Sequence, residues 1–399
     1  MANKRVLVLG GNFAGVTAAL SLKHELGGDV DVTVVSKSDC FQFNPSLIWV
    51  PFGKRTRSDL TFPIAPTFEA RGVEFVHGEA MRIDLDAERV ETSRGPYGYD
   101  YLVVATGYVN DFDVVPGLGP GGNAHAITDF DSAVEAAVGW TRFLNDPGPV
   151  VVAATQGAAC FGAAYEFVFN VAHQLRKHRL RVPLSYVSAE PFPGHFGIGG
   201  LPGGEKLLGM FFRMQRIDGV FDVATKEVAP GELHLDNGRT LPFKYAMVVP
   251  PFLGAEVVTA SALGNAKGFI EVKDTYQTHT HPNVYAVGIA TAVNAPWESA
   301  NALGVPKTGF PVETMARVAA TNIAAQIRGE EPAREENFAD IPAVCIMDAG
   351  NNGVVILADH MLPPRKRALM IPGPQSHLAK LAFERYFLWK TRNGYVTLP

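Results

Sequence analysis

The chain is poor in cysteine, and its few cysteines are widely spaced. Its 399 residues include only three, Cys40, Cys160 and Cys345, with no C-x-x-C spacing. So small a set excludes a disulfide scaffold, and the missing spacing argues against structural zinc and c-type haem. We therefore expect no metal site.

Charge and long apolar runs are also scarce. Charged residues make up 19% of the chain and the formal net charge is −5, which gives no general attraction to nucleic acid. No apolar stretch reaches the roughly 18 residues that a membrane-spanning helix needs. The N-terminus runs directly into an apolar segment, so we expect no signal peptide and only peripheral contact with a membrane.

Apolar residues, glycine and proline are plentiful. Hydrophobic residues account for 47%, and the 40 glycines and 28 prolines are spread along the chain without an internal repeat. This composition indicates a globular protein with many tight turns, long enough for two or three domains.

Residues 4–26, KRVLVLGGNFAGVTAALSLKHEL, combine an apolar run, a glycine turn and a helical apolar spacing. The turn approximates the dinucleotide-binding pattern G-x-G-x-x-G, whose helix N-terminus binds a pyrophosphate. Asn12 stands at the middle glycine, and asparagine tolerates left-handed backbone better than most residues. An ordinary strand–helix turn is the alternative interpretation. The predicted cofactor contacts are Gly10, Asn12, Phe13, Ala14 and Gly15.

Three later segments support a dinucleotide site. The next strand pattern ends at Ser36 and Lys37, where an acid usually binds the ribose. Residues 99–109 form a buried strand pattern that ends in Ala105-Thr106-Gly107, and residues 281–293 run into Gly288-Ile289. This order of segments is typical of flavoproteins with two dinucleotide-binding domains. It predicts FAD.

A second turn of this kind lies midway, in PVVVAATQGAACFGAAYEF. Ala153 and Thr155 replace its first two glycines, so a pyrophosphate could not approach closely and nicotinamide binding is disfavoured. Cys160 stands where the helix begins, and a helix N-terminus stabilises a thiolate. A small buried core cysteine is the alternative. Glu166 lies about 240° around the helix from the thiol, which favours a structural role.

The C-terminal segment is basic and apolar. Residues 361–392 carry seven Lys or Arg against one acid, Glu384, and include the apolar string LAKLAFERYFLW. Such a helix can lie in a membrane interface with its basic residues on anionic lipid. A helix packed on the protein's own core, or a dimer contact, is the alternative.

Five strings together resemble sulfide:quinone oxidoreductase. They are FQFNPSLIWVPFG, QGAACFGAAYEF, PFPGHFGIGG, GVPKTGFPVE and YFLWKTRNGY, in order along the chain. The resemblance implies an α/β fold with two Rossmann-like, glutathione-reductase-like domains and a C-terminal membrane-associating segment. It implies an FAD enzyme that oxidises sulfide, reduces a membrane quinone and lies peripherally on the cytoplasmic membrane, with a homo-oligomer possible.

The resemblance also assigns residues. Cys160 and Cys345 would form the redox pair, joined through a disulfide or extra sulfur, and His195 would lie near the sulfide entrance as an acid–base or positioning group. Lys307, Thr308 and Gly309 would contact the flavin ring. The quinone site would include Phe41 and Lys390. The implied FAD-binding domain comprises residues 1–112 and 285–340, the second Rossmann-like domain residues 113–284, and the C-terminal region residues 341–399.

One departure stands out. Many family members carry a further cysteine where this chain has Thr128, and a histidine where it has Ser132. Three rivals therefore remain. They are a type II NADH:quinone oxidoreductase, the flavin subunit of a flavocytochrome c sulfide dehydrogenase, and a non-catalytic flavin- or sulfur-binding homologue.

Overall fold

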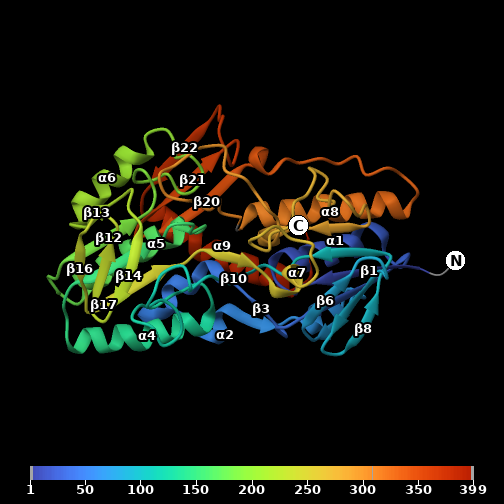
Figure 1. Cartoon of the computed structure of the whole chain (residues 1–399), viewed down its shortest axis with the longest axis horizontal. Coiled ribbons are helices and arrows are strands. Elements are labelled where there is room, and N and C mark those ends of the chain that lie inside the picture. The colour runs from blue at the N-terminus through green and yellow to red at the C-terminus, as the bar shows by residue number, and fades with distance from the viewer. Residues whose placement is uncertain (1–2, 308, 397–399) are drawn as a thin grey trace.

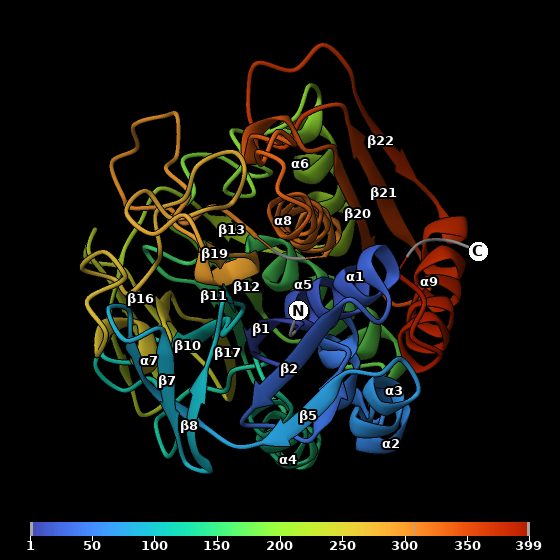
Figure 2. The ribbon, with the colours of Figure 1, turned by 90° about the vertical axis from the view of Figure 1, so that its right-hand side faces the viewer.

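The computed structural model describes residues 3–307 and 309–396. One of its two large sheets is parallel and five-stranded, in the order β19-β9-β1-β2-β5. Helices α1 (Phe13–Leu26) and α8 (Phe310–Ile327) pack side by side on one face of this sheet (Figure 2). The five strands are β1 (Lys4–Leu9), β2 (Val30–Ser36), β5 (Glu74–His77), β9 (Tyr101–Val104) and β19 (Val284–Ala286).

The opposite face of this sheet is covered by a small antiparallel sheet and by residues 255–270. Ile83 and Val90 of the small sheet share a buried cluster with Leu102, Val257 and Ile270. Strands buried on both faces need continuous apolar runs, which explains the sequence of β1. The covering elements are β6 (Ala80–Asp84), β7 (Arg89–Thr92), β8 (Gly95–Gly98) and α7 (Glu256–Thr259).

A second parallel sheet has the order β13-β12-β11-β17. Three helices lie on one face of it, and a three-stranded antiparallel sheet covers the other (Figure 1). The parallel strands are β11 (Val150–Ala154), β12 (Leu184–Ser188), β13 (Asp218–Val220) and β17 (Tyr245–Val249). The covering elements are α4 (Phe130–Asn145), α5 (Phe161–Lys177), α6 (Gly204–Gln215), β14 (Thr225–Ala229), β15 (Glu232–Leu235) and β16 (Thr240–Pro242).

The C-terminal part is an antiparallel sheet followed by a long helix. Both lie at one side of the molecule, and the helix packs against the first two strands of the sheet (Figure 2). These elements are β20 (Ala343–Asp348), β21 (Gly353–Ala358), β22 (Ala368–Pro372) and α9 (Pro374–Arg392). The remaining short elements are β3 (Cys40–Gln42), η1 (Asn44–Phe52), α2 (Arg57–Leu60), β4 (Thr61–Pro63), α3 (Ala65–Glu69), β10 (Tyr108–Asn110), β18 (Phe252–Gly254), η2 (Gly288–Ala290) and η3 (Phe338–Asp340).

The predicted α/β class with two Rossmann-like sheets is confirmed. Strands β10 and β18 pair where the chain crosses between the two sheets. Val257, Val258 and Ile270 already pack on the first sheet, so the predicted domain boundary at residue 285 falls inside the part that belongs with that sheet. Within the described part of the chain, no helix is both long and apolar enough to cross a membrane.

Candidate functional site

The turn between β1 and α1 requires its outer glycines. Gly10 has φ +110°, and a Cβ there would collide with the carbonyl of Ala105. A Cβ on Gly15 would collide with the carbonyl of Gly10. Only glycine allows this close approach of strand, turn and helix. Asn12 is in extended backbone at φ −114°, so its tolerance of left-handed backbone, which we expected to matter, is not used.

The ends of β2 and β9 meet this turn. The Ser36 side chain lies against Gly11, and its hydroxyl donates to the carbonyl of Ser38. Lys37 instead points to the surface and pairs with Glu79 at 3.0 Å. Its role as a cofactor contact therefore has no support in this geometry.

The predicted Ala105-Thr106-Gly107 segment contributes an unpaired group. The Thr106 hydroxyl oxygen is buried and has no hydrogen-bond partner among the described residues. From the other side, Gly288 of η2 has φ +70° and approaches the side chain of Ala14. Ile289 follows in the same short element. A glycine cradle at a helix N-terminus beside an orphaned hydroxyl fits a bound dinucleotide.

Lys307 is buried beside Thr291, the residue at which η2 ends. Its ammonium donates to the carbonyl of Thr291 and lies 4.1 Å from the centroid of the Phe269 ring. Burial lowers the pKa of Lys307 to about 7. Gly309 is the N-cap of α8 with φ +74°, while Thr308 lies outside the described residues.

The second turn is closed by Thr155. Its backbone N–H and its hydroxyl both donate to the carbonyl of Val249, and Ala153 is fully buried in β11. Cys160 follows as the N-cap of α5. The helix start was expected to lower the thiol pKa. That was wrong, because burial raises the pKa of Cys160 to about 11 and outweighs the hydrogen bond from the Ala163 backbone.

Cys345 lies on the inner face of β20. Side chains alternate along a strand, so Cys345 points to the same side as the buried Ala343 and Met347, although it is itself exposed. Although the residue as a whole is exposed, the thiol faces the packed side of the strand, and its desolvation there raises the pKa of Cys345 to about 12, with smaller contributions from Glu166 and Cys160. Cys160 and Cys345 therefore lie close enough to interact electrostatically, and both are free thiols.

A buried ion pair joins α5, the helix that begins after Cys160, to the C-terminal helix α9. Lys380 Nζ of α9 is 2.6 and 2.7 Å from the two carboxylate oxygens of Glu166 on α5. The backbone N–H of Asp348, at the end of β20, also donates to Glu166 at 2.7 Å. Burial raises the pKa of Glu166 to about 7 even though Lys380 opposes the shift. Lys380 could not be identified from the sequence as the partner of Glu166, because only the fold joins α5 to α9.

Asp348 holds the end of β20 in place. Trp49 Nε1 donates to its carboxylate at 2.8 Å, Asn170 donates at 3.0 Å, and His377 Nδ1 lies 2.5 Å away. Burial alone would raise the pKa of Asp348, but the hydrogen bonds from Trp49 and His377 together hold it below its usual range. This network fixes the strand that carries Cys345 against α5.

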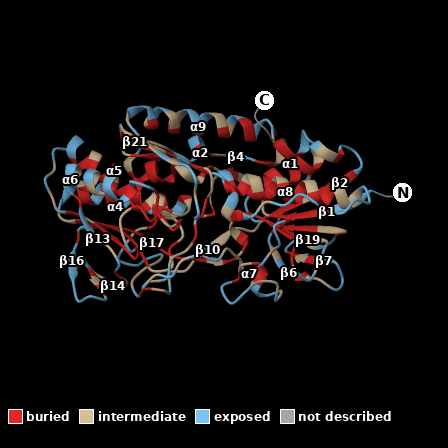
Figure 3. Cartoon of the chain, turned by 90° about the horizontal axis from the view of Figure 1, so that it is seen from above, coloured by how far each residue is buried: buried red, intermediate tan, exposed pale blue. Residues whose placement is uncertain are grey.

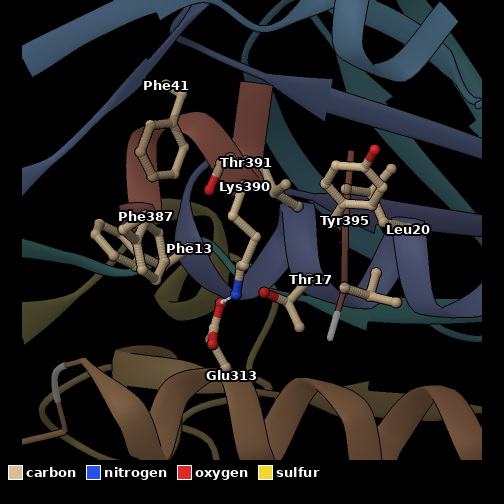
Figure 4. Close-up of a pocket in the computed structure, with 11 residues that line it drawn as sticks. Phe13, Thr17, Leu20, Phe41, Glu313, Phe387, Lys390, Thr391 and Tyr395 are labelled. Carbon is tan, nitrogen blue, oxygen red and sulfur yellow. Dashed lines mark hydrogen bonds and ion pairs between the residues drawn. The ribbon is translucent and has the colours of Figure 1, made fainter. Parts of the chain in front are cut away.

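A separate pocket gathers the two predicted quinone residues. Figure 4 shows Phe41 with Phe13 and Phe387 on one side, and the Lys390 ammonium directed at the Glu313 carboxylate. The Lys390–Glu313 distance is 2.5 Å, and both side chains are largely buried. Glu313 and Phe387 were not identified from the sequence, since each lies inside an ordinary helical pattern.

His195 is buried, with 4% of its surface exposed, and its Nδ1 has no partner among the described residues. Burial, followed by the charge of Arg365, lowers the pKa of His195 to about 4. An acid–base role for His195 near neutral pH, which the resemblance implied, therefore has no support in this geometry, and the side chain does not face solvent. Thr128 accepts a hydrogen bond from Tyr108 through its carbonyl, and Ser132 bonds the N-cap Asp129 of α4.

Helix α9 buries two lysines and exposes several large apolar side chains. Apolar side chains point outward, with Leu378 65%, Phe383 37% and Trp389 48% exposed. Figure 3 shows the exposed outer side of this helix at the edge of the molecule. Lys380 and Lys390 are buried in ion pairs, which corrects our expectation that they meet lipid. The buried positions are Ser376, Lys380, Glu384, Phe387, Lys390 and Thr391.

Known proteins resemble this chain along its whole length. Residues 4–304 match the family described as pyridine nucleotide-disulphide oxidoreductase. The sulfide-quinone reductase of Aquifex aeolicus (strain VF5) is 35% identical over 98% of this chain and 92% of the relative. The crystal structure of the sulfide:quinone oxidoreductase from that bacterium superposes with a TM-score of 0.94, covering 98% of this chain and 92% of that one.

The alternative assignment as a type II NADH:quinone oxidoreductase has matches over a shorter part of this chain. The type II NADH:quinone oxidoreductase of Staphylococcus epidermidis (strain ATCC 12228 / FDA PCI 1200) is also 35% identical, but over 29% of this chain and 29% of the relative. Overall identity therefore does not separate the two relatives, whereas coverage does.

Proposed function

The chain belongs to the sulfide-quinone reductase family within the pyridine nucleotide-disulphide oxidoreductases, and we propose that it oxidises sulfide to zero-valent sulfur and passes two electrons to a membrane quinone. It is an FAD-dependent oxidoreductase. The observation that carries the proposal is the convergence of Cys160 on α5 and Cys345 on β20, in a chain that also has a glycine cradle for a dinucleotide.

FAD is the cofactor that the cradle fits. The turn from Gly10 to Gly15 would hold its pyrophosphate at the N-terminus of α1, and the Ser36 hydroxyl lies where a ribose hydroxyl is usually bound. Lys307, which the resemblance assigns to the flavin ring, would be only partly protonated at neutral pH in the absence of the cofactor, because its pKa is about 7. When bound, FAD supplies two-electron chemistry between a sulfur donor and a quinone.

The cysteines carry the sulfur chemistry. Hydrosulfide attacks one sulfur of a Cys160–Cys345 disulfide, forming a new S–S bond and breaking the old one. The products are a persulfide on one cysteine and a thiolate on the other, so the incoming sulfur has become zero-valent and the pair holds two electrons. Net re-formation of the bridge then releases one proton, two electrons and the zero-valent sulfur, which a second hydrosulfide takes up as polysulfide. The two electrons would pass to bound FAD and then to the quinone.

The electrostatics disfavour a thiolate at this pair. Because the thiol pKa values lie at about 11 and 12, a thiolate on either cysteine is costly at neutral pH. The neutral dithiol and the disulfide both avoid that cost, so the pKa values do not select between them. We infer that the thiolate exists only as a reactive intermediate.

We assign the quinone to the pocket between α1, α8 and α9. Phe13, Phe41 and Phe387 pack on one another along its wall, and a quinone head group would bind beside this aromatic cluster. The Lys390–Glu313 pair would place an ammonium and a carboxylate beside the quinone oxygens. Protons for quinone reduction can pass through such a pair.

A lipid-facing surface would bring quinone to this pocket. We define it as the exposed side chains of Val344, Leu357 and Leu369, which are opposite one another in the β20–β22 sheet, and of Leu378, Phe383 and Trp389 on α9. Between residues 361 and 396 the single acid, Glu384, is buried in a pair with Arg55, whereas Lys366, Arg367, Arg385 and Arg392 are exposed. An apolar surface with exposed cations beside it suits an anionic bilayer. We propose peripheral attachment to the cytoplasmic membrane on this basis.

Turnover with purified holoenzyme tests the function. Sulfide with a soluble quinone analogue should give rapid quinone reduction, and NADH in place of sulfide should give none. Thr155 closes the turn where a pyrophosphate would need glycine, so the structure offers a reason for NADH to fail. Quinone reduction by NADH but not by sulfide would overturn the proposal.

A further inference from the structure

Two backbone hydrogen bonds join the turn after β11 to a segment between η2 and α8. Gly157 N–H donates to the carbonyl of Ala302 at 2.5 Å, and Gly304 N–H donates to the carbonyl of Ala158 at 2.9 Å. The two bonds run in opposite directions, so each segment both donates and accepts. They fix how the two segments lie against each other, although the segments are far apart in the chain.

Space, and not backbone conformation, requires glycine at position 304. Gly304 does not have a positive φ, so other residues could adopt its backbone conformation. A Cβ there would lie 2.6 Å from the Cβ and 2.9 Å from the Cα of Ala159, and 3.0 Å from the carbonyl oxygen of Ala158. Backbone atoms in a packed interior cannot move aside as the end of a flexible side chain can. Any side chain at this position would therefore push the segment and the turn apart.

Gly304 is also packed against the glycine-rich loop. A Cβ on Gly197 would lie 2.4 Å from the carbonyl oxygen of Gly304 and 3.2 Å from the Phe161 ring. The same loop is tied to α5, because Gly194 N–H donates to the hydroxyl of Tyr165 at 2.8 Å. The segment around Gly304 is therefore held by both the turn and the loop, close to the start of α5.

The segment leads from this contact to Lys307 within three residues. Val305 is part of the main core cluster, and Lys307 is buried beside Thr291. Three residues of fully extended chain span at most about 11 Å, which limits the distance between Gly304 and Lys307. We call residues 302–307 the strap. It rests on the turn that leads directly into Cys160, and it ends at a residue that the resemblance assigns to the flavin ring.

We propose that Gly304 is a positioning residue for the sulfide half of the reaction, an assignment that rests on the proposed function. Because it has no side chain, the strap lies directly on Ala158 and Ala159, and this contact sets the place of Cys160 relative to Lys307. Catalysis is sensitive to such alignment, since a misplacement of about 1 Å can cost about a hundredfold in rate. Gly304 therefore acts through Cys160, and not by contact with sulfide.

Gly304→Ala tests this contact in stopped-flow experiments. We expect sulfide to reduce the flavin of this holoenzyme at least tenfold more slowly than in the wild type, while quinone reoxidises the reduced flavin at the wild-type rate. Adding Ala159→Gly removes the nearest atom that the new Cβ would meet, and should recover at least threefold of the loss. Gly209→Ala on α6 is the matched control, because a Cβ there meets no atom outside its own helix within 4 Å. A wild-type rate in Gly304→Ala, or no recovery with Ala159→Gly, overturns the proposal.

Alkylation of Cys160 provides a measurement that needs no turnover. Burial raises the pKa of this thiol to about 11, so a displaced turn should expose it and increase its reactivity. In reduced Gly304→Ala, iodoacetamide at pH 8 should modify Cys160 at least threefold faster than in the wild type, as followed by mass spectrometry. Ala159→Gly in the same chain should reverse part of the increase. An unchanged rate at Cys160 contradicts the proposal.

A longer strap tests the same idea without a steric clash. One glycine inserted between Val305 and Pro306 keeps Gly304 as it is but loosens the link to Lys307. Flavin reduction by sulfide should again slow at least tenfold, and a wild-type rate in this variant overturns the proposal even if Gly304→Ala fails to fold. A wild type whose flavin is not reduced by sulfide contradicts the proposed function instead, and the alkylation of Cys160 then still decides the role of Gly304.

Discussion

Lys380 Nζ lies within 2.7 Å of both carboxylate oxygens of Glu166, in the interior between α5 and α9. This pair ties the C-terminal helix to the helix that begins at Cys160. Two further buried pairs, Arg55–Glu384 and Lys390–Glu313, hold the same helix. Ion pairs therefore hold α9 against the protein. Its exposed side includes the apolar side chains of Leu378, Phe383 and Trp389.

Removing one member of the Lys380–Glu166 pair should be strongly destabilising. Lys380→Met leaves Glu166 buried without its cation, and breaking a buried pair in this way costs about 3–5 kcal/mol. Denaturant unfolding of the holoenzyme measures this change. Lys366→Met, at an exposed position in the same region, is the matched control and should change stability by less than about 0.5 kcal/mol. The double variant Glu166→Gln/Lys380→Met should recover part of the loss, and a double variant no more stable than Lys380→Met would argue that the pair is not coupled.

The reduced cysteines should react slowly with alkylating agents at mild pH. The thiolate is the nucleophile, and pKa values of about 11 and 12 leave little thiolate on Cys160 or Cys345 at pH 8. Iodoacetamide modification, followed by mass spectrometry, should be about a hundredfold slower than for free cysteine. Because both pKa values are raised, the rate should keep rising about tenfold per pH unit between pH 8 and 10. A rate already constant above pH 7 would mean that the helix N-terminus outweighs burial.

Lys390 should affect the quinone half of the reaction and leave the sulfide half unchanged. Lys390→Met removes the ammonium from the aromatic pocket, so we expect quinone reduction to slow about tenfold or more while sulfide still reduces the enzyme at the wild-type rate. Steady-state kinetics with varied quinone and a single-turnover sulfide experiment separate the two effects. Arg385→Met, an exposed cation on the same helix, is the control. Equal slowing of both half-reactions would place Lys390 in a structural role only.

The exposed apolar side chains of α9 should govern membrane binding. Leu378→Glu combined with Trp389→Glu places two acids among apolar groups that we expect to contact lipid, and should reduce sedimentation with anionic vesicles about tenfold or more. Met214→Glu on α6, which is 67% exposed elsewhere on the molecule, is the control and should bind as wild type. Equal binding by all three proteins would exclude α9 as the lipid-facing element.

The sequence predicted features that depend on local backbone chemistry. The strand–turn–helix at Gly10 and Gly15 was recognisable because glycine alone permits its close contacts, and the order of later strand ends followed from apolar runs. The resemblance supplied the pairing of Cys160 with Cys345, which no local pattern could provide. The two cysteines lie far apart in the chain and meet only through the packing of α5 on β20.

Features that depend on tertiary burial were missed or misjudged. The thiol pKa of Cys160 was predicted from the helix start alone, and burial reverses that prediction. His195 lies in a glycine-rich loop that looked exposed, yet the loop folds inward against Phe192 and Trp297. In α9, the mixture of lysine and apolar residues did not reveal which side faces the core, because the ion-pair partners are on α5 and α8.

The most direct test is anaerobic stopped-flow absorbance of the purified holoenzyme mixed with sulfide, alongside Cys160→Ser and Cys345→Ser. We predict that sulfide reduces the wild-type flavin rapidly and that each variant is slower by about a hundredfold or more, because the disulfide that hydrosulfide attacks cannot form. A wild-type flavin that stays oxidised with sulfide but is reduced by NADH would contradict the account. So would serine variants that reduce as fast as wild type.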